Sequence, residues 1–172
     1  RAKIYCEINA AASYRKLMTA YNTYIDSLEQ SLIKSTSSKN KSICKPYVTS
    51  GFRDNGLQTD LYTAYEKRGF NPPQVAQPGK SNHQAGLALD IIGTQEEVSN
   101  GVKGAARGVR LEGSGLFYEW MKKNAPVYGF KRTVLSEPWH WEFRNQWVGS
   151  RENDYWGNAL ESNQPIASQA AA

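Results

Sequence analysis

The sequence predicts an α+β domain, in which a small antiparallel sheet carries the functional site and helices flank the sheet, one of them at the N-terminus. Segments typical of short strands are mixed with helical segments, without the regular alternation of a parallel α/β fold. The chain has 172 residues, which is most simply one domain, and a domain of this size hides roughly 70% of its unfolded surface. Hydrophobic residues at 40% and charged residues at 22% are typical of a globular protein with a real core.

The first half of the chain predicts two helices separated by a strand. Apolar side chains recur at three- and four-residue steps across residues 8–34, which predicts a long helix. The polar stretch 35–42 predicts a loop. Residues 43–50 are rich in β-branched and aromatic side chains and predict a strand. A second helix is expected at about residues 57–68, and Gly69 ends it.

The second half predicts short strands around one helix. Residues 87–92, LALDII, predict a short buried strand. The glycine-rich stretch 93–115 predicts a long loop; its basic residues could serve a substrate flap, although a plain surface excursion is the simpler interpretation. A helix is expected at 114–124, and the segments YGFKR (128–132) and WHWEFR (139–144) predict paired strands.

These elements suggest three segments in one chain. Residues 1–42 are expected to form an N-terminal helical segment that packs on the rest of the domain, and residues 43–150 are expected to form the core of that domain. The small, polar residues 151–172 predict a C-terminal tail that is partly disordered. No apolar run approaches the ~20 residues of a membrane span, so we expect no span in this chain.

The charge of the chain limits its partners only loosely. The net charge is +5 and the pI is about 9.2, which favours anionic surroundings such as nucleic acid, acidic lipid or cell-wall polymer. The basic residues are scattered, however, so a generally solvated basic surface is the simpler interpretation. Since no RNA-binding signature surrounds the aromatic residues, nucleic acid is not an expected partner.

Two cysteines leave the redox state of the chain open. A disulfide between Cys6 and Cys44 would tie the N-terminal segment to the strand that is predicted to start near Ile43. An exported protein would favour this bridge and a cytosolic protein would not. Neither cysteine lies in a CxxC pair, so a structural zinc site built from them is not expected.

The two histidines of the chain both lie in compact segments that carry carboxylates. The segment SNHQAGLALD holds His83 and Asp90, and EPWHWEF holds His140. Catalytic zinc sites usually take three protein ligands, often His with one carboxylate, and keep one position for water. Each residue has an ordinary alternative, since a histidine can be polar surface, an aspartate can cap a turn and tryptophans can simply fill a core. Their joint occurrence favours a metal site.

Strand alternation places these side chains on suitable faces. Successive side chains of a strand point to opposite faces, so Asp90 points away from the bulkiest side chains of its segment. By the same argument His140 points away from Trp141 and its aromatic neighbours. Gly86 permits a turn that would bring His83 back over Asp90.

A metal-bound water needs a base, and two glutamates compete for that role. A carboxylate beside the metal is suited to it, and Glu137 lies three residues before His140. Simple alternation would place Glu137 on the wrong face, but Pro138 disturbs regular pairing there, so a turn or bulge could swing Glu137 toward the metal. Glu142 is the competitor because it shares the face of His140.

Three segments resemble the motifs of a known family. SNHQAGLALD (81–90) resembles the S-x-H-x-x-G-x-A-x-D motif of VanY-like D-alanyl-D-alanine carboxypeptidases, and EPWH (137–140) resembles their E-x-W-H motif. VTSGFRDNGLQ (48–58) resembles their S-G-[YF]-R segment, which is followed five residues after the Arg by Gln. These enzymes belong to a zinc peptidase superfamily that also contains lysostaphin-type endopeptidases and the hedgehog signalling domain. The resemblance spans about residues 48–144.

The resemblance implies a role for each residue of the proposed metal site. His83, Asp90 and His140 would ligate one zinc ion, so that the small antiparallel sheet carries the zinc site. Glu137 would act as the general base that activates the water and later protonates the leaving amine. The resemblance thus favours Glu137 over Glu142, to which it gives no catalytic role.

Three further residues match family positions near the substrate. Arg53 would stabilise the oxyanion of the tetrahedral intermediate, and a fixed donor of this kind can contribute ~3–4 kcal/mol. Ser81 and Gln58 match positions that contact substrate. The alternatives are a surface charge for Arg53, a turn cap for Ser81 and the exposed start of a helix for Gln58.

The expected function is zinc-dependent hydrolysis of a peptide bond next to D-Ala in peptidoglycan stem peptides, as in a D,D-carboxypeptidase. The alternatives are an L,D-carboxypeptidase or endopeptidase of the same fold, including a phage lysis enzyme, and a zinc-bound binding module without catalysis. We expect a monomer that acts on the stem peptide outside the cytoplasm, in the cell wall or periplasm or after secretion. The signal or anchor for that location is not expected within this chain.

Overall fold

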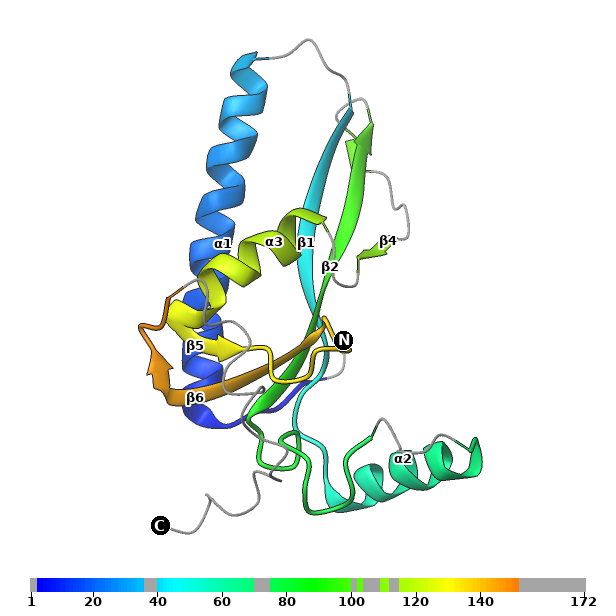
Figure 1. The fold of residues 1–172 in the computed structure, drawn as a ribbon. Helices are drawn as coiled ribbons and strands as arrows, with labels where there is room; N and C mark the ends of the chain where they lie inside the picture. The colour runs from blue at the N-terminus through cyan, green and yellow to red at the C-terminus, as the bar shows by residue number, and fades with distance from the viewer. Residues whose placement is uncertain are drawn as a thin grey trace.

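The predicted α+β class is confirmed by a computed structural model, which describes residues 3–35, 40–69, 75–99, 102–103, 109–111 and 115–151. An antiparallel sheet runs in the order β1-β2-β6-β5, and β3 and β4 also pair with β2 (Figure 1). The elements are α1 (Ile8–Ser35), β1 (Asn40–Ser50), α2 (Asn55–Lys67), β2 (Ala88–Ser99), β3 (Val102–Lys103), β4 (Val109–Leu111), α3 (Gly115–Asn124), η1 (Ala125–Val127), β5 (Tyr128–Lys131) and β6 (His140–Val148).

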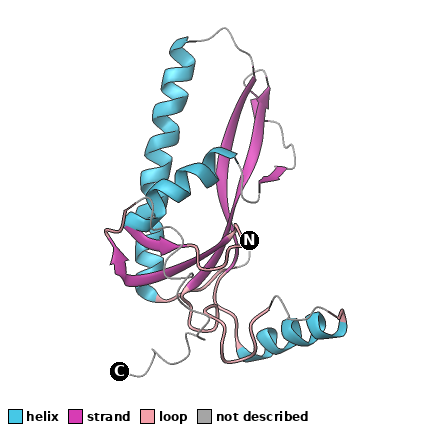
Figure 2. Cartoon of the chain, in the orientation of Figure 1, coloured by secondary structure: helices cyan, strands magenta, loops and turns pink. Residues whose placement is uncertain are grey.

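Among the described residues, helices α1 and α3 contribute most of the helical side chains of the hydrophobic core, and α2 contributes none. Figure 2 shows α1 and α3 beside the strands, while α2 extends away from the sheet. Helix α3 packs on β1 and β2, and α1 packs on β5 and β6. Asp54 caps the start of α2 by accepting a hydrogen bond from the Leu57 amide at 2.8 Å. The predicted helices at 8–34, 57–68 and 114–124 are therefore present, with boundaries that differ by at most two residues.

The core joins the N-terminal helix to the sheet. Tyr21 of α1 meets the rings of Phe117 and Trp120 edge-on, with centroids 5.0 and 5.1 Å away. Such edge-to-face pairs add to the stabilisation that burial provides. The buried core cluster draws on α1, α3 and the strands: Ala10, Leu17, Tyr21, Leu89, Ile91, Phe117, Trp120, Met121, Ala125, Phe130, Trp141 and Phe143. The long N-terminal helix therefore shares one core with the sheet.

The prediction of a long loop at 93–115 is wrong for the residues of that segment that the structure describes. Strand β2 continues to Ser99 and pairs with β1 from Asp90 to Ser99. The short strands β3 and β4 then pair back onto β2. Glycines suggested a loop, but the backbone of β1 offers a full row of partners to these residues, and such tertiary pairing overrides a weak local preference. Lys103 and Arg110 thus lie in β3 and β4, and Arg107 lies outside the described residues.

The N-terminal residues before α1 run beside the turn that carries His83. The Glu7 amide donates to the Gly86 carbonyl at 2.9 Å, and the Phe52 amide donates to the Tyr5 carbonyl at 2.7 Å.

Cys6 carries a free thiol, so the structure does not contain the possible disulfide between Cys6 and Cys44. Burial, followed by the charge of Glu7, raises the pKa of that thiol.

The three-segment division of the chain stays a prediction. The tail expected at 151–172 lies outside the described residues after position 151. Across the described ranges, none of the helices combines the length and apolar character needed to cross a bilayer.

Substitution of Gly86 by alanine should lower the free energy of unfolding by more than the same change at Gly79. Both residues have positive φ, 71° and 83°, a conformation that costs an L-residue roughly 1–2 kcal/mol. A Cβ at Gly86 would also lie 2.8 Å from the Glu7 amide nitrogen, whereas a Cβ at Gly79 would meet nothing within 4 Å. Urea denaturation of the two variants separates the cost of the positive φ, which both variants share, from the cost of the close contact with Glu7, which only Gly86→Ala has. Equal destabilisation would show that the contact with Glu7 is not tight in solution.

Candidate functional site

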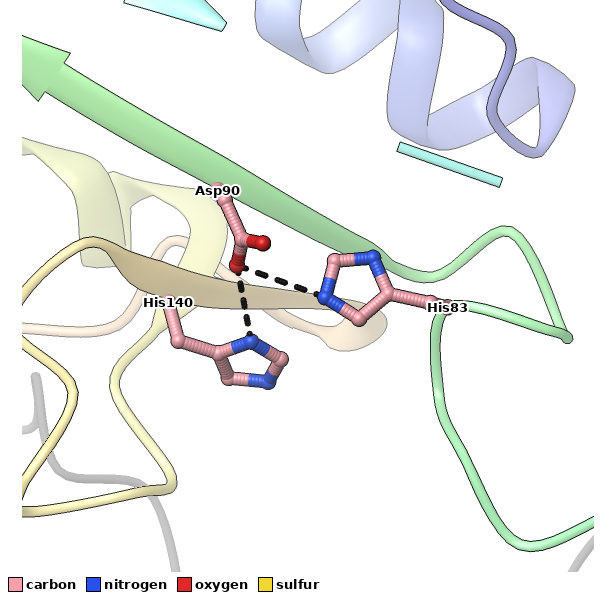
Figure 3. Close-up of side chains that lie close together, drawn as sticks. All are labelled: His83, Asp90 and His140. Carbon is pink, nitrogen blue, oxygen red and sulfur yellow. Dashed lines mark hydrogen bonds and ion pairs between the residues drawn. The ribbon is translucent and has the colours of Figure 1, made fainter. Parts of the chain in front are cut away.

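The pairing of β2 with β6 brings two of the predicted metal ligands together. Asp90 lies directly opposite His140, which is the first residue of β6. His83 reaches the same point from the turn before β2 (Figure 3). The His83 Nε2 and His140 Nδ1 atoms lie 3.3 and 3.1 Å from Asp90 Oδ1. All three residues are buried, and their ligand atoms lie within 4.8 Å of one another.

A tight turn holds His83 in place. The Gly86 amide donates to the His83 carbonyl at 3.1 Å, and the Leu87 amide donates to the Asn82 carbonyl at 3.0 Å. The His83 Nδ1 atom lies 2.7 Å from the Gly51 carbonyl oxygen. Since a carbonyl can only accept, Nδ1 carries a proton, and Nε2 is the ring nitrogen that faces Asp90.

The ring of His140 lies between two carboxylates. Its Nδ1 faces Asp90 and its Nε2 lies 3.1 Å from Glu142 Oε1. Burial opposes the charged imidazolium, but the hydrogen bonds to Asp90 and Glu142 outweigh burial and raise the pKa of His140 to about 9. Burial would likewise raise the pKa of Asp90, but hydrogen bonds from His140 and His83 hold it far below its usual range. A metal cation bound by these three side chains would, like the proton on His140, compensate the negative charge of Asp90.

The donor set fits a metal ion by its chemistry and by its spacing. Two imidazole nitrogens and one carboxylate are a common protein contribution to a catalytic metal centre. In a tetrahedral site with bonds of about 2.0–2.1 Å, neighbouring ligand atoms are about 3.3 Å apart. The separations from Asp90 Oδ1 to His83 and His140, 3.3 and 3.1 Å, are close to that value. Little rearrangement is therefore needed to hold an ion.

Glu137 lies next to this cluster because a turn precedes β6. The His140 amide donates to the Glu137 carbonyl at 3.1 Å, and the Glu137 amide donates to the Val134 carbonyl at 3.2 Å. As a result, Glu137 Oε2 lies 3.9 Å from His140 Nδ1, on the side of the ring that faces Asp90. Burial raises the pKa of Glu137, an effect that the charge of His140 partly offsets. A carboxylate with a raised pKa is better matched to accepting and returning a proton.

Arg53 contacts the other oxygen of Asp90. Its guanidinium donates to Asp90 Oδ2 at 2.9 Å and, through Nε, to Ser50 Oγ at 3.0 Å. The Arg53 amide also donates to the His83 carbonyl at 3.1 Å. Arg53 therefore contacts the cluster directly. The alternative interpretation, in which Arg53 is a surface charge, does not account for these contacts.

The two predicted substrate contacts have structural partners. Ser81 Oγ accepts a hydrogen bond from the His83 amide at 3.3 Å, as a turn cap would. Gln58 is fully buried, so its alternative as the exposed start of a helix is wrong. Its Nε2 donates to the Ala76 carbonyl at 2.7 Å, while its Oε1 has no hydrogen-bond partner among the described residues. Contact of Ser81 and Gln58 with a substrate stays a prediction.

Sequence reasoning underestimated Glu142. Only 3% of its surface is exposed, and it contacts the Nε2 atom of His140, on the opposite side of the ring from Asp90. Strand alternation had already placed Glu142 on the face of His140, and this was the available signal. The contact of His83 with the Gly51 carbonyl had no signal in the sequence, because a backbone atom can serve at any residue.

Comparison with known proteins extends the motif resemblance to most of the chain. The family model of VanY, D-alanyl-D-alanine carboxypeptidase, matches residues 19–146. A D-alanyl-D-alanine carboxypeptidase from Enterococcus faecalis is 29% identical over 120 residues, which cover 57% of this chain and 40% of the relative. This chain thus spans about two fifths of the length of that curated relative.

The fold also has a solved counterpart. The structure of VanYB in complex with D-alanine-D-alanine superposes with a TM-score of 0.52 at 19% identity, covering 95% of this chain and 92% of that one. At this identity the likeness establishes the fold alone. Because the family model covers about three quarters of the sequence, including all seven predicted site residues, the chain belongs to the VanY D-alanyl-D-alanine carboxypeptidase family.

Proposed function

We propose that this protein is a zinc-dependent D,D-carboxypeptidase that removes the terminal D-Ala from peptidoglycan stem peptides. The observation that carries the proposal is the buried cluster of His83, Asp90 and His140 with the Glu137 carboxylate beside it. Membership of the VanY family supports the reaction class. The place of action would be outside the cytoplasm, where stem peptides are exposed, and the protein would act as a monomer.

The three clustered side chains would hold one zinc ion. His83 would bind through Nε2 and His140 through Nδ1, since the other nitrogen of each ring is engaged with Gly51 or Glu142. When bound, zinc polarises a scissile carbonyl and lowers the pKa of a coordinated water toward ~7. Three protein ligands leave a coordination position open for that chemistry.

Glu137 would move the proton. Its carboxylate lies on the Asp90 side of the His140 ring, so it would accept a proton from the attacking water and return it to the departing amine. Its side chain is 25% exposed, which leaves it accessible to substrate. Glu142 is engaged with the far side of the ring and would not reach the water.

Arg53 would hold the negative charge of the substrate. A guanidinium has five N–H groups, and two of its nitrogens already donate to Ser50 and Asp90. The guanidinium would present its other N–H groups to the oxyanion or to the terminal carboxylate of the peptide. These contacts would fix the guanidinium beside the reacting bond, where a preorganised donor stabilises developing charge.

Digestion of defined peptides tests the proposal. The zinc-loaded protein should release one alanine from a stem peptide that ends in D-Ala-D-Ala, and mass spectrometry of the products reads this directly. A peptide that ends in a single D-Ala after an L-residue should stay intact, as should a cross-linked dimer. Cleavage only of the second peptide would assign an L,D-carboxypeptidase, and cleavage only of the dimer would assign an endopeptidase. Zinc binding without any cleavage would leave a binding module.

A further inference from the structure

We propose that Glu142 is a positioning residue that holds the His140 ring with Nδ1 toward the metal, and that Arg144 and Asn82 hold Glu142 in turn. The inference rests on the proposed zinc site and deepens it. It concerns a side chain to which the family motifs give no role. Glu142 contacts the cluster only through His140 Nε2, the ring nitrogen that points away from Asp90. Its effect would therefore pass through the orientation and basicity of His140.

The first step is the contact between Glu142 and the ring. Glu142 Oε1 lies 3.1 Å from His140 Nε2, and both side chains leave β6 on the same face, two residues apart. An ionised carboxylate only accepts hydrogen bonds, so Nε2 must carry the proton. A metal ion that replaces the Nδ1 proton would then meet the Nδ1 lone pair on the side where Asp90 lies.

The second step is what holds the carboxylate. The Arg144 guanidinium lies 3.4 Å from Glu142 Oε2 and donates to Asn82 Oδ1 at 3.2 Å. It also lies over the Trp147 ring, 5.5 Å from its centroid, which limits its movement. Asn82 directly precedes His83 and accepts the Leu87 amide through its carbonyl. This series of contacts, His140–Glu142–Arg144–Asn82, thus connects strand β6, which carries His140, to the turn that carries His83.

The two histidines are held by different kinds of acceptor. His83 donates to the neutral Gly51 carbonyl, whereas His140 donates to an anion. A carboxylate behind a metal-bound histidine fixes its tautomer and raises its basicity, and loss of such a partner typically weakens metal binding about 10–100-fold. His140 should therefore be the more strongly donating imidazole. The acceptor behind His140 is a side chain, which substitution can remove, whereas the acceptor behind His83 is a backbone carbonyl.

The first test reads the tautomers directly. The chain contains only two histidines, so a long-range ¹⁵N–¹H correlation spectrum of the zinc-loaded protein shows two imidazole spin systems. The expected result is opposite tautomers: protonated Nδ1 for His83 and protonated Nε2 for His140, with the Nε2 proton of His140 protected from exchange. A protonated Nδ1 on His140, or coordination through its Nε2, would overturn the proposal without any variant having to fold.

The second test measures zinc affinity by competition with a chromogenic chelator. Glu142→Ala should weaken zinc binding about 10–100-fold, and Glu142→Gln should restore most of the affinity, because its amide oxygen still accepts from Nε2. Glu119→Ala is the matched control, since Glu119 is an exposed glutamate paired only with Lys122 in the described part of the chain. Affinity of Glu142→Ala equal to wild type would overturn this proposal alone. A wild-type protein that binds no zinc would overturn the proposed function, and this proposal with it.

Discussion

Replacement of Glu137 by alanine should lower kcat about 10²–10⁴-fold, the usual contribution of a general acid–base residue, and leave zinc binding unchanged. The physical reason is position. Glu137 approaches the cluster from the side of His140 Nδ1 at 3.9 Å, yet it is not one of the three side chains that could share an ion. Stopped assays with the D-Ala-D-Ala peptide give kcat, and metal analysis of the purified variant gives the zinc content.

Glu137→Gln is the appropriate control for this experiment. Glutamine keeps the size and hydrogen bonding of the side chain but cannot take up a proton at neutral pH, so it should be as inactive as alanine. Near-normal turnover of either variant would remove Glu137 from the mechanism. A variant that also lost its zinc would instead show that Glu137 helps to hold the ion.

Substitution of His83 or His140 by alanine should abolish both stoichiometric zinc binding and activity. Removal of one of three ligands leaves two donors, fewer than a catalytic zinc site uses. For the wild-type protein, zinc present at 100 times its dissociation constant should add about 2.7 kcal/mol to the free energy of unfolding. The His83→Ala protein should gain almost nothing, and thermal unfolding with and without zinc compares the two.

Chelation completes this ligand experiment. Treatment of the wild-type protein with a chelator should remove activity, and one equivalent of zinc should restore it. The apo protein should remain folded, because α1, α3 and the strands share an apolar core away from the cluster. Full activity of the His83→Ala protein, or activity that survives complete removal of metal, would contradict the metal-dependent mechanism.

Several features of the site were predictable from local patterns. Strand alternation predicts that Asp90 points to one face of its strand and that Leu89 and Ile91 point to the other. In the structure, Leu89 and Ile91 lie in the core cluster. The same rule put His140 and Glu142 on one face, where they are in contact. Gly86 was expected to permit a turn, and its φ of 71° is one that glycine adopts readily. Each of these inferences depends on a few adjacent residues.

The failures have a common cause. The segment 93–115 was predicted as a loop from its glycines, but β1 pairs with its first residues, up to Ser99. The alternative interpretation of Gln58 as the exposed start of a helix is likewise wrong, because Gln58 is fully buried and donates to the Ala76 carbonyl. In both cases the outcome depended on a partner far away in the chain or outside the local pattern.

The α+β class, the main helices and the small set of side chains able to bind a metal could all be predicted from composition, periodicity and motif spacing, because these are local properties. The three-dimensional structure was needed to establish that Asp90 lies opposite His140, that a turn brings Glu137 to 3.9 Å from His140 Nδ1, and that Glu142, which alternation places on the same face, contacts His140 Nε2. These facts depend on strand register and on which buried polar atoms find partners. The register of β2 with β6 is set by contacts between segments that are distant in the sequence, and the distances around His140 depend on the turn and side-chain packing that this register holds in place.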